Sequence, residues 1–133
     1  IGKALLLNEG TDVSIFATGH MVWKAIEAGH ILAEKGINAE IINIHTIKPL
    51  DEKAVLNSIA KTKCIVTAEE HMRHGGLGDS IAQLMARTSP TPQEYVAVDD
   101  SFGESGTPNE LMTKYGIDTI NVVEAALKVI QRK

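Results

Sequence analysis

The sequence is poor in cysteine, in aromatic residues and in long apolar runs. Cys64 is the single cysteine among 133 residues, which excludes an internal disulfide and favours a reducing compartment such as the cytoplasm. No apolar run approaches the roughly 20 residues that span a membrane. One Trp, two Tyr and two Phe, together with no run of basic residues, argue against nucleic-acid binding. We therefore expect neither a membrane nor a nucleic acid as partner.

The remaining composition is typical of one globular domain. Hydrophobic residues make up 44% of the chain and charged residues 23%, and the formal net charge is −4. A length of 133 residues matches the usual domain size of about 100–150 residues. The chain begins at Ile1 and not at a methionine. We therefore expect residues 1–133 to form a single domain that is a piece of a longer protein.

Short β-rich runs alternate with stretches of helical periodicity. Apolar and β-branched residues predict strands over 12–18, 39–45, 64–68 and 94–98, with 3–7 as a further edge strand. Apolar stripes predict helices over 22–33, 55–60, 77–85 and 123–130, and a proline-containing helix start over 107–110. Four strand–helix repeats predict an α/β fold, with a mostly parallel sheet covered by helices on both faces.

In such a sheet, ligands bind beyond the carboxyl ends of the strands, where the strand order reverses. If the first parallel strand is central, the segment 18–20 and the loop 69–78 meet there. The glycine-rich part of this loop leads into a helix N-terminus, whose free N–H groups favour an anion. Alternatively, these glycines only permit a tight turn and close packing. The candidate anion crevice comprises Thr18, Gly19, His20, Glu70, His71, Gly75, Gly76 and Gly78.

Residues that could carry catalysis are few. His71 and His74 stand beside Glu69 and Glu70, but their spacing matches no zinc-hydrolase pattern, so we predict no metal site. Glu70 and His71 would suit acid–base chemistry only if both faced one crevice. A buried Cys64 would be a protonated, unreactive thiol. The sequence holds no complete triad or phosphate loop, and we assign no catalytic residue to it.

Three bulky apolar residues, Met21, Val22 and Trp23, follow the first parallel strand directly, and they are candidates for a surface that contacts a partner. One helix face cannot bury all three, because consecutive residues point in different directions around a helix. We expect Trp23 to lie on the far side from the core, either in solvent or against a partner. The alternative is partial burial of Trp23 under a loop.

Four segments of the chain resemble, in order, the C-terminal domain of transketolases. They read DVSIFATGHMV, NIHTIKPLD, EEHMRHGGLGDSIA and FGESGTPNELMTKYGI, and together they extend over nearly the whole chain. The resemblance implies a three-layer α/β/α domain with a mostly parallel five-stranded sheet and one antiparallel edge strand. A split transketolase, with separate N- and C-terminal polypeptides, is similar as well.

The resemblance also implies where the chemistry resides. In this family thiamine diphosphate and a divalent metal lie between two other domains, and the intact dimeric enzyme transfers a two-carbon ketol unit between sugar phosphates of the pentose phosphate pathway. No segment here matches the motifs that bind the cofactor. We therefore expect this chain alone to bind no cofactor, to be inactive, and to pack against the remaining transketolase domains or an N-terminal subunit.

Two other interpretations stay open. The 2-oxoacid dehydrogenase β subunits and the deoxyxylulose-phosphate synthases have a related domain with a similar turn and glycine-rich loop. The second interpretation is that the chain is a stand-alone module, which would bind a nucleotide or another anion through the glycine-rich loop and His20.

Overall fold

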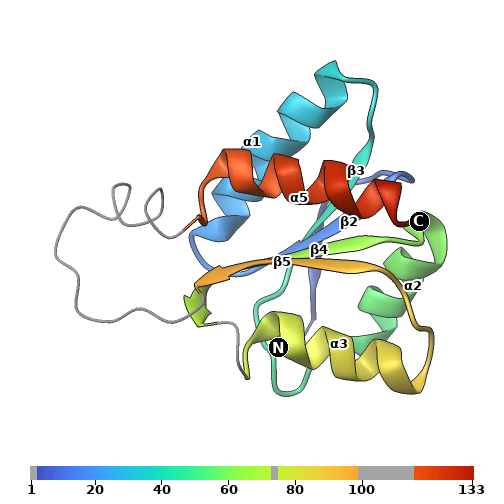
Figure 1. The fold of residues 1–133 in the computed structure, drawn as a ribbon. Helices are drawn as coiled ribbons and strands as arrows, with labels where there is room; N and C mark the ends of the chain where they lie inside the picture. The colour runs from blue at the N-terminus through green and yellow to red at the C-terminus, as the bar shows by residue number, and fades with distance from the viewer. Residues whose placement is uncertain (1–2, 73–74, 99–115) are drawn as a thin grey trace, which may run out of the picture.

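A central sheet between two helical layers makes up the fold (Figure 1). The structure is a computed structural model, and it describes residues 3–72, 75–98 and 116–133. The strands are β1 (Leu5–Asn8), β2 (Val13–Ala17), β3 (Ala39–Asn43), β4 (Ile65–Met72) and β5 (Gln93–Val98). The helices are α1 (Met21–Glu34), α2 (Glu52–Thr62), α3 (Leu77–Arg87) and α5 (Thr119–Gln131).

The strand order is β1-β3-β2-β4-β5, so β2 occupies the centre of the sheet. β2 pairs in parallel with β3 on one side and with β4 on the other, and β5 continues the parallel sheet beyond β4. β1 pairs with β3 and is antiparallel. The predicted α/β architecture, with five strands and one antiparallel edge strand, is confirmed.

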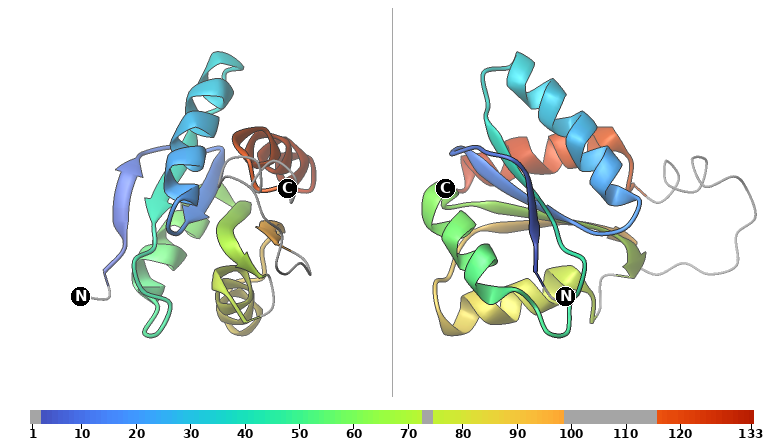
Figure 2. Two further views of the ribbon diagram at one scale, coloured as in Figure 1. Left: turned by 90° about the vertical axis from the view of Figure 1, so that its left-hand side faces the viewer. Right: turned by 180° about the vertical axis from the view of Figure 1, so that it is seen from behind.

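Successive residues of β2 belong to opposite faces of the sheet, as the strand period of two requires. Val13, Ile15 and Ala17 join the core cluster that contains α1 and α5. Phe16 joins the cluster that contains α2 and α3. Figure 2 shows these two helix pairs on opposite sides of the sheet. β2 is therefore buried on both faces, which explains why its run is apolar except at Ser14.

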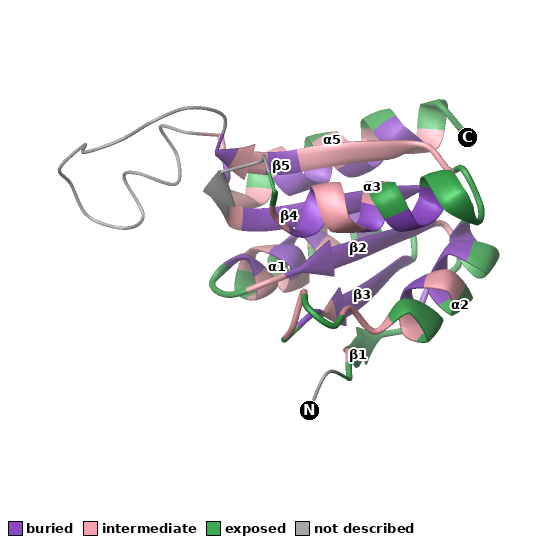
Figure 3. Ribbon diagram, turned by 90° about the horizontal axis from the view of Figure 1, so that it is seen from below, coloured by how far each residue is buried: buried purple, intermediate pink, exposed green. Residues whose placement is uncertain are grey.

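The edge strand β1 contrasts with the buried centre of the sheet (Figure 3). Its three leucines, Leu5, Leu6 and Leu7, are 51%, 47% and 38% exposed. A short edge strand with three exposed leucines lacks the charged residues that normally keep such edges from pairing.

One local prediction differs from the structure. Residues 69–72, predicted as loop, continue β4, and Met72 is in register with Val98 after an irregularity. The charged sequence there suggested solvent exposure, yet Glu69 is buried and its carboxylate is hydrogen-bonded. The helix start predicted over 107–110 lies outside the described residues. No helix in the described part of the chain is long and apolar enough to cross a membrane.

The apolar residues after β2 differ in burial according to their positions around α1. Met21 is fully buried, so its predicted contribution to a partner surface is wrong. Trp23 is 71% exposed, which confirms that it points away from the core.

Candidate functional site

The carboxyl ends of β2, β3 and β4 meet at the point where the strand order reverses. After β2 the chain continues through α1 to β3 on one side, and β4 lies on the other side of β2. The Thr18 N–H donates to the Ala68 carbonyl oxygen at 3.1 Å, and the Ile44 N–H donates to the Ala17 carbonyl oxygen at 2.9 Å. These bonds fix the segments that follow the three strands beside one another, as the sequence predicts for a ligand site.

Gly19 and His20 lie against Glu70, as the sequence analysis expected. Gly19 has a φ of 57°, a left-handed conformation that favours glycine, and a Cβ there would collide with Glu70 Oε1. His20 Nδ1 lies 3.8 Å from Glu70 Oε2, and the His20 N–H donates to Glu70 Oε1 at 3.5 Å. With 72% of the His20 side chain exposed, this pair contributes little to stability.

The chain's own carboxylate occupies the N-terminus of α3. The Leu77 N–H donates to Glu69 Oε1 at 2.9 Å, and the Gly78 N–H donates to Glu69 Oε2 at 2.8 Å. The Gly75 N–H donates to Asp79 Oδ2 at 2.8 Å. Three of the N–H groups that the sequence offered to an external anion therefore already have internal acceptors.

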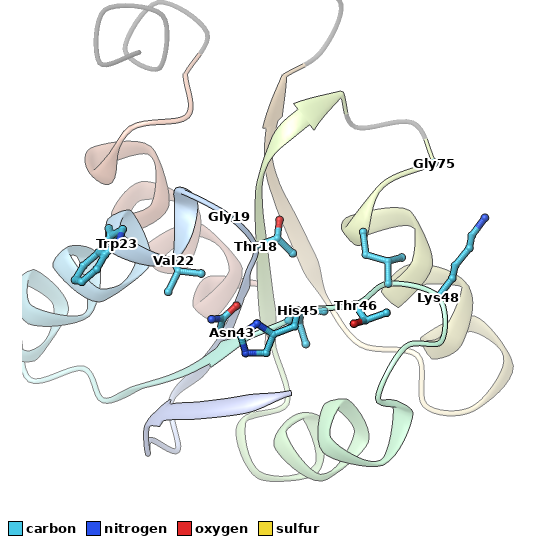
Figure 4. Close-up of a pocket in the computed structure, with 11 residues that line it drawn as sticks. Thr18, Gly19, Val22, Trp23, Asn43, His45, Thr46, Lys48 and Gly75 are labelled. Carbon is cyan, nitrogen blue, oxygen red and sulfur yellow. The ribbon is translucent and has the colours of Figure 1, made fainter. Parts of the chain in front are cut away.

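A crevice of about 840 Å³ opens beside this helix end, between the ends of β2 and β3 (Figure 4). Three predicted site residues, Thr18, Gly19 and Gly75, line the crevice. His20, Glu70, Gly76 and Gly78 do not line it, and the side chain of His71 lies outside the described part. The other lining residues are Val22, Trp23, Asn43, Ile44, His45, Thr46, Ile47 and Lys48.

Sequence reasoning missed the polar residues Asn43, His45, Thr46 and Lys48. All four come from the segment NIHTIKPLD, which begins at the last residue of β3, the strand next to the central one. The same rule that selected the segment after β2 applies to this segment, because parallel neighbours end at the same edge of the sheet. The signal was therefore present, but the sequence analysis assigns Asn43 and His45 only to the end of a predicted strand and gives Thr46 and Lys48 no role in a site.

Asp51 fixes the C-terminal end of this segment. Its Oδ1 accepts from the Ala54 N–H at 3.2 Å as the N-cap of α2, and its Oδ2 accepts from the Ala4 N–H at 2.9 Å. Hydrogen bonds from the Ala4 and Ala54 amides lower the pKa of the Asp51 carboxyl, against an opposing effect of burial. The ionised carboxylate thus joins α2, the crevice segment and the start of the chain.

We predict that Asp51→Ala lowers the free energy of unfolding by about 1–2 kcal/mol at neutral pH, because the variant loses a helix cap and a hydrogen bond to the Ala4 amide, just before the edge strand. The pKa of the folded state is below that of the unfolded state. The contribution is therefore fully present above about pH 4 and is lost as the pH falls through the lowered pKa. Denaturant unfolding of both proteins at pH 7 and at pH 2.5 measures the difference, which should shrink at the lower pH. A constant difference would contradict the assigned role of the charge.

Cys64 behaves as the sequence analysis expected of a buried thiol. Its Sγ lies 3.3 Å from the Asp12 carbonyl oxygen, and burial raises the pKa of the thiol. The raised pKa disfavours the thiolate, which is the nucleophilic form.

Known proteins match this chain along almost its whole length. Residues 2–122 match the model of the family described as "Transketolase, C-terminal domain". The chain is 47% identical over 133 residues to the 6-deoxy-6-sulfo-D-fructose transketolase subunit SqwH of Clostridium sp. (strain MSTE9), covering all of this chain and 41% of the relative. It is 37% identical to the putative transketolase C-terminal section of Methanocaldococcus jannaschii, covering all of this chain and 42% of the relative.

Other relatives belong to a different enzyme of the same family. A 1-deoxy-D-xylulose-5-phosphate synthase of Desulforudis audaxviator is 38% identical over 128 residues, which cover 95% of this chain and 20% of the relative. The chain therefore spans between a fifth and about two fifths of the length of the relatives named here.

Solved structures agree with these matches. A structure described as "Split gene transketolase, inactive beta4 tetramer" superposes with a TM-score of 0.94 at 41% identity, covering 98% of this chain and 43% of the other. A transketolase from Pichia stipitis superposes with a TM-score of 0.72 at 20% identity, covering 98% of this chain and 18% of the other, which supports the fold alone. By sequence and by fold, the chain belongs to the transketolase C-terminal domain family.

Proposed function

We propose that this chain is the C-terminal domain of the C-terminal subunit of a split transketolase. The superposition on the split-gene transketolase carries this proposal, with a TM-score of 0.94 at 41% identity over 98% of this chain. Two relatives support it further, one described as a transketolase subunit and one as a transketolase C-terminal section. This chain covers 41% of the first and 42% of the second. The assembled enzyme would transfer a two-carbon ketol unit from a ketose to an aldose phosphate in sugar-phosphate metabolism, with a cytoplasmic location that suits the free thiol of Cys64.

A deoxyxylulose-phosphate synthase is the second candidate. The 38% identity to the Desulforudis audaxviator enzyme supports it, because this value is close to the 37% identity to the transketolase section of Methanocaldococcus jannaschii. The two candidates differ in chemistry outside this domain. The donor that the assembled enzyme accepts, a ketose phosphate or pyruvate, distinguishes them.

Thiamine diphosphate and its metal are the cofactors that the family implies for the intact enzyme. The residues of this chain do not fit them. No group of three His, Cys, Asp or Glu side chains among the described residues could hold a metal ion. The amides at the start of α3, the glycine-rich place suited to a diphosphate, already bond Glu69. We therefore derive no step of the reaction from this chain and propose that the cofactor binds in the partner domains.

The test is reconstitution of ketol transfer. The chain alone should show no transfer from xylulose 5-phosphate to ribose 5-phosphate, and mixing it with the missing cofactor-binding part should restore transfer. Pyruvate offered with glyceraldehyde 3-phosphate tests the synthase reaction in the same mixture. Turnover by the chain alone, or saturable binding of thiamine diphosphate and Mg²⁺ to it in calorimetry, would overturn the proposal.

We further propose that β1 contributes to assembly with the neighbouring domain or with a second copy in a dimer. Its three exposed leucines support this, because contiguous exposed apolar groups characterise interfaces. A strand at the edge of a sheet also presents unpaired backbone groups to a partner.

A charge on β1 should weaken assembly without unfolding the chain. We predict that Leu5→Lys weakens association with the partner, or self-association, about tenfold, because burying an unpaired ammonium in an apolar contact is unfavourable. Ile120→Lys is the matched control, since Ile120 on α5 is 56% exposed and Leu5 is 51% exposed. Sedimentation velocity measures association, and thermal unfolding should move little for either variant. Equal effects of the two substitutions on association would exclude β1 as the interface.

A further inference from the structure

Polar side chains alternate with apolar ones along the lining of the crevice. Within the described residues, no hydrogen bond or ion pair involves the side chains of Thr18, Asn43, His45, Thr46 and Lys48. Polar groups nearby behave differently, since Glu69 bonds the start of α3 and Asp51 bonds two amides. These five side chains are therefore available to a ligand at the concave end of the sheet.

The charge of the lining is opposite to that of the chain. The lining contains one lysine and one histidine but no Asp or Glu, whereas the whole chain carries 17 acidic residues and a net charge of −4. Glu70 lies behind Gly19, where it contacts His20, and it does not line the crevice. An ammonium, an imidazole, an amide and two hydroxyls can each donate a hydrogen bond, and together they suit a ligand group with several anionic oxygens.

The two ends of the crevice differ in chemistry. Figure 4 shows Trp23 at one end and Lys48 with Gly75 at the other, and Thr18, Asn43, His45 and Thr46 between them. Trp23 presents an indole that is 71% exposed, beside the partly buried Val22. An exposed indole offers a stacking surface to a planar ring. The volume of about 840 Å³ lies in the range of pockets that hold small organic ligands.

We propose that this crevice binds a nucleoside monophosphate, with the phosphate toward Lys48 and the planar base on Trp23. The ribose would lie along the hydroxyl and amide groups between these ends. This inference names a ligand for the anion-binding interpretation given under the sequence. It places the binding site at the end of β3 and not at the start of α3. It rests on the fold and not on ketol transfer, so it can fail or succeed independently of the proposed enzyme.

Titration of the 133-residue chain with AMP tests the proposal, and the chain supplies its own probe. Trp23 is the only tryptophan, so a change in intrinsic fluorescence reports on the crevice directly. We expect saturable quenching by AMP. Adenosine and ribose 5-phosphate should each bind at least about fivefold more weakly, because one lacks the phosphate and the other lacks the base. Calorimetry provides a readout that does not depend on the indole.

Lysine substitutions supply the matched comparison. Lys48→Ala should weaken AMP binding about tenfold, as expected for the loss of one charge-assisted hydrogen bond. Lys35→Ala is the control, because Lys35 is an exposed lysine at the C-terminal end of α1 and the substitution changes the net charge equally. It should leave the affinity within about twofold by the same reasoning, since the exposed ammonium lies outside the crevice. Trp23→Phe should weaken binding of AMP, as followed by calorimetry, and leave that of inorganic phosphate unchanged.

Three results would overturn the proposal. The first is no binding of AMP at millimolar concentration, and the second is equal weakening by Lys48→Ala and Lys35→Ala. The third is equal affinity for AMP and ribose 5-phosphate, which would show that no base is recognised. None of these measurements needs the partner subunit or turnover. If the nucleotide-binding proposal fails, the ketol-transfer proposal can therefore still hold.

Discussion

Replacing Glu69 with alanine should lower the free energy of unfolding by about 3–4 kcal/mol, because two buried amides lose a charged acceptor at once. The carboxylate is 1% exposed and receives the N–H groups of Leu77 and Gly78, at the first turn of α3. A negative charge at a helix N-terminus is also stabilised by the helix dipole. In Glu69→Ala the amides become unsatisfied and a cavity replaces the side chain, so both costs act in the same direction.

Two variants separate these contributions. Glu69→Gln keeps the volume and one acceptor oxygen but places an amide group against an N–H donor, so its loss should lie between those of the wild type and Glu69→Ala. Glu70→Ala removes the adjacent carboxylate, which is 31% exposed and contacts His20 at 3.8 Å, and should cost less than about 1 kcal/mol. Denaturant unfolding followed by circular dichroism measures all three. A loss for Glu69→Ala no larger than that for Glu70→Ala would show that the buried carboxylate is not what holds α3.

Glu69 also illustrates why the sequence predicts an anion site at the start of α3 that the structure does not leave open. A pair of glutamates after an apolar run reads as the start of a surface loop, since charged residues are rarely buried without partners. The partners here are backbone amides, which carry no sequence signal of their own. The sequence correctly predicts that the glycine-rich segment begins a helix. It also predicts that the amides there bind an external anion, whereas in the structure they bind the carboxylate of Glu69.

The sheet, in contrast, followed from local patterns. Nearly continuous apolar runs such as that of β2 predict strands covered on both faces, and the helical stripes between them predict parallel connections. The central place of β2 was a conditional expectation that the strand order confirms. The crevice itself depends on how closely the segment 43–48 approaches the segment 18–23. That distance is a tertiary property which residue periodicity does not encode.

The packing of β3, which positions Asn43 and His45, depends on a glycine far from the crevice. Gly10 is buried, and its N–H donates to Glu40 Oε1 at 3.2 Å. A Cβ added at Gly10 would lie 2.5–2.6 Å from backbone atoms of Asn38, Ala39 and Glu40. Backbone atoms in a sheet cannot move aside as a flexible side chain can, because neighbouring strands hold their register.

We therefore predict that Gly10→Ala lowers the free energy of unfolding by at least about 3 kcal/mol, at or beyond the upper end of ordinary overpacking. Gly36→Ala is the matched control, since Gly36 has a φ of 78° but nothing within 4 Å of an added Cβ. It should cost only the left-handed backbone conformation, about 1–2 kcal/mol. Thermal and denaturant unfolding measure the loss of stability in each variant, which comes from a steric clash in Gly10→Ala and from backbone strain in Gly36→Ala. Losses of equal size would mean that the start of β3 yields to an added methyl group, and that Gly10 does not fix the strand that carries the crevice.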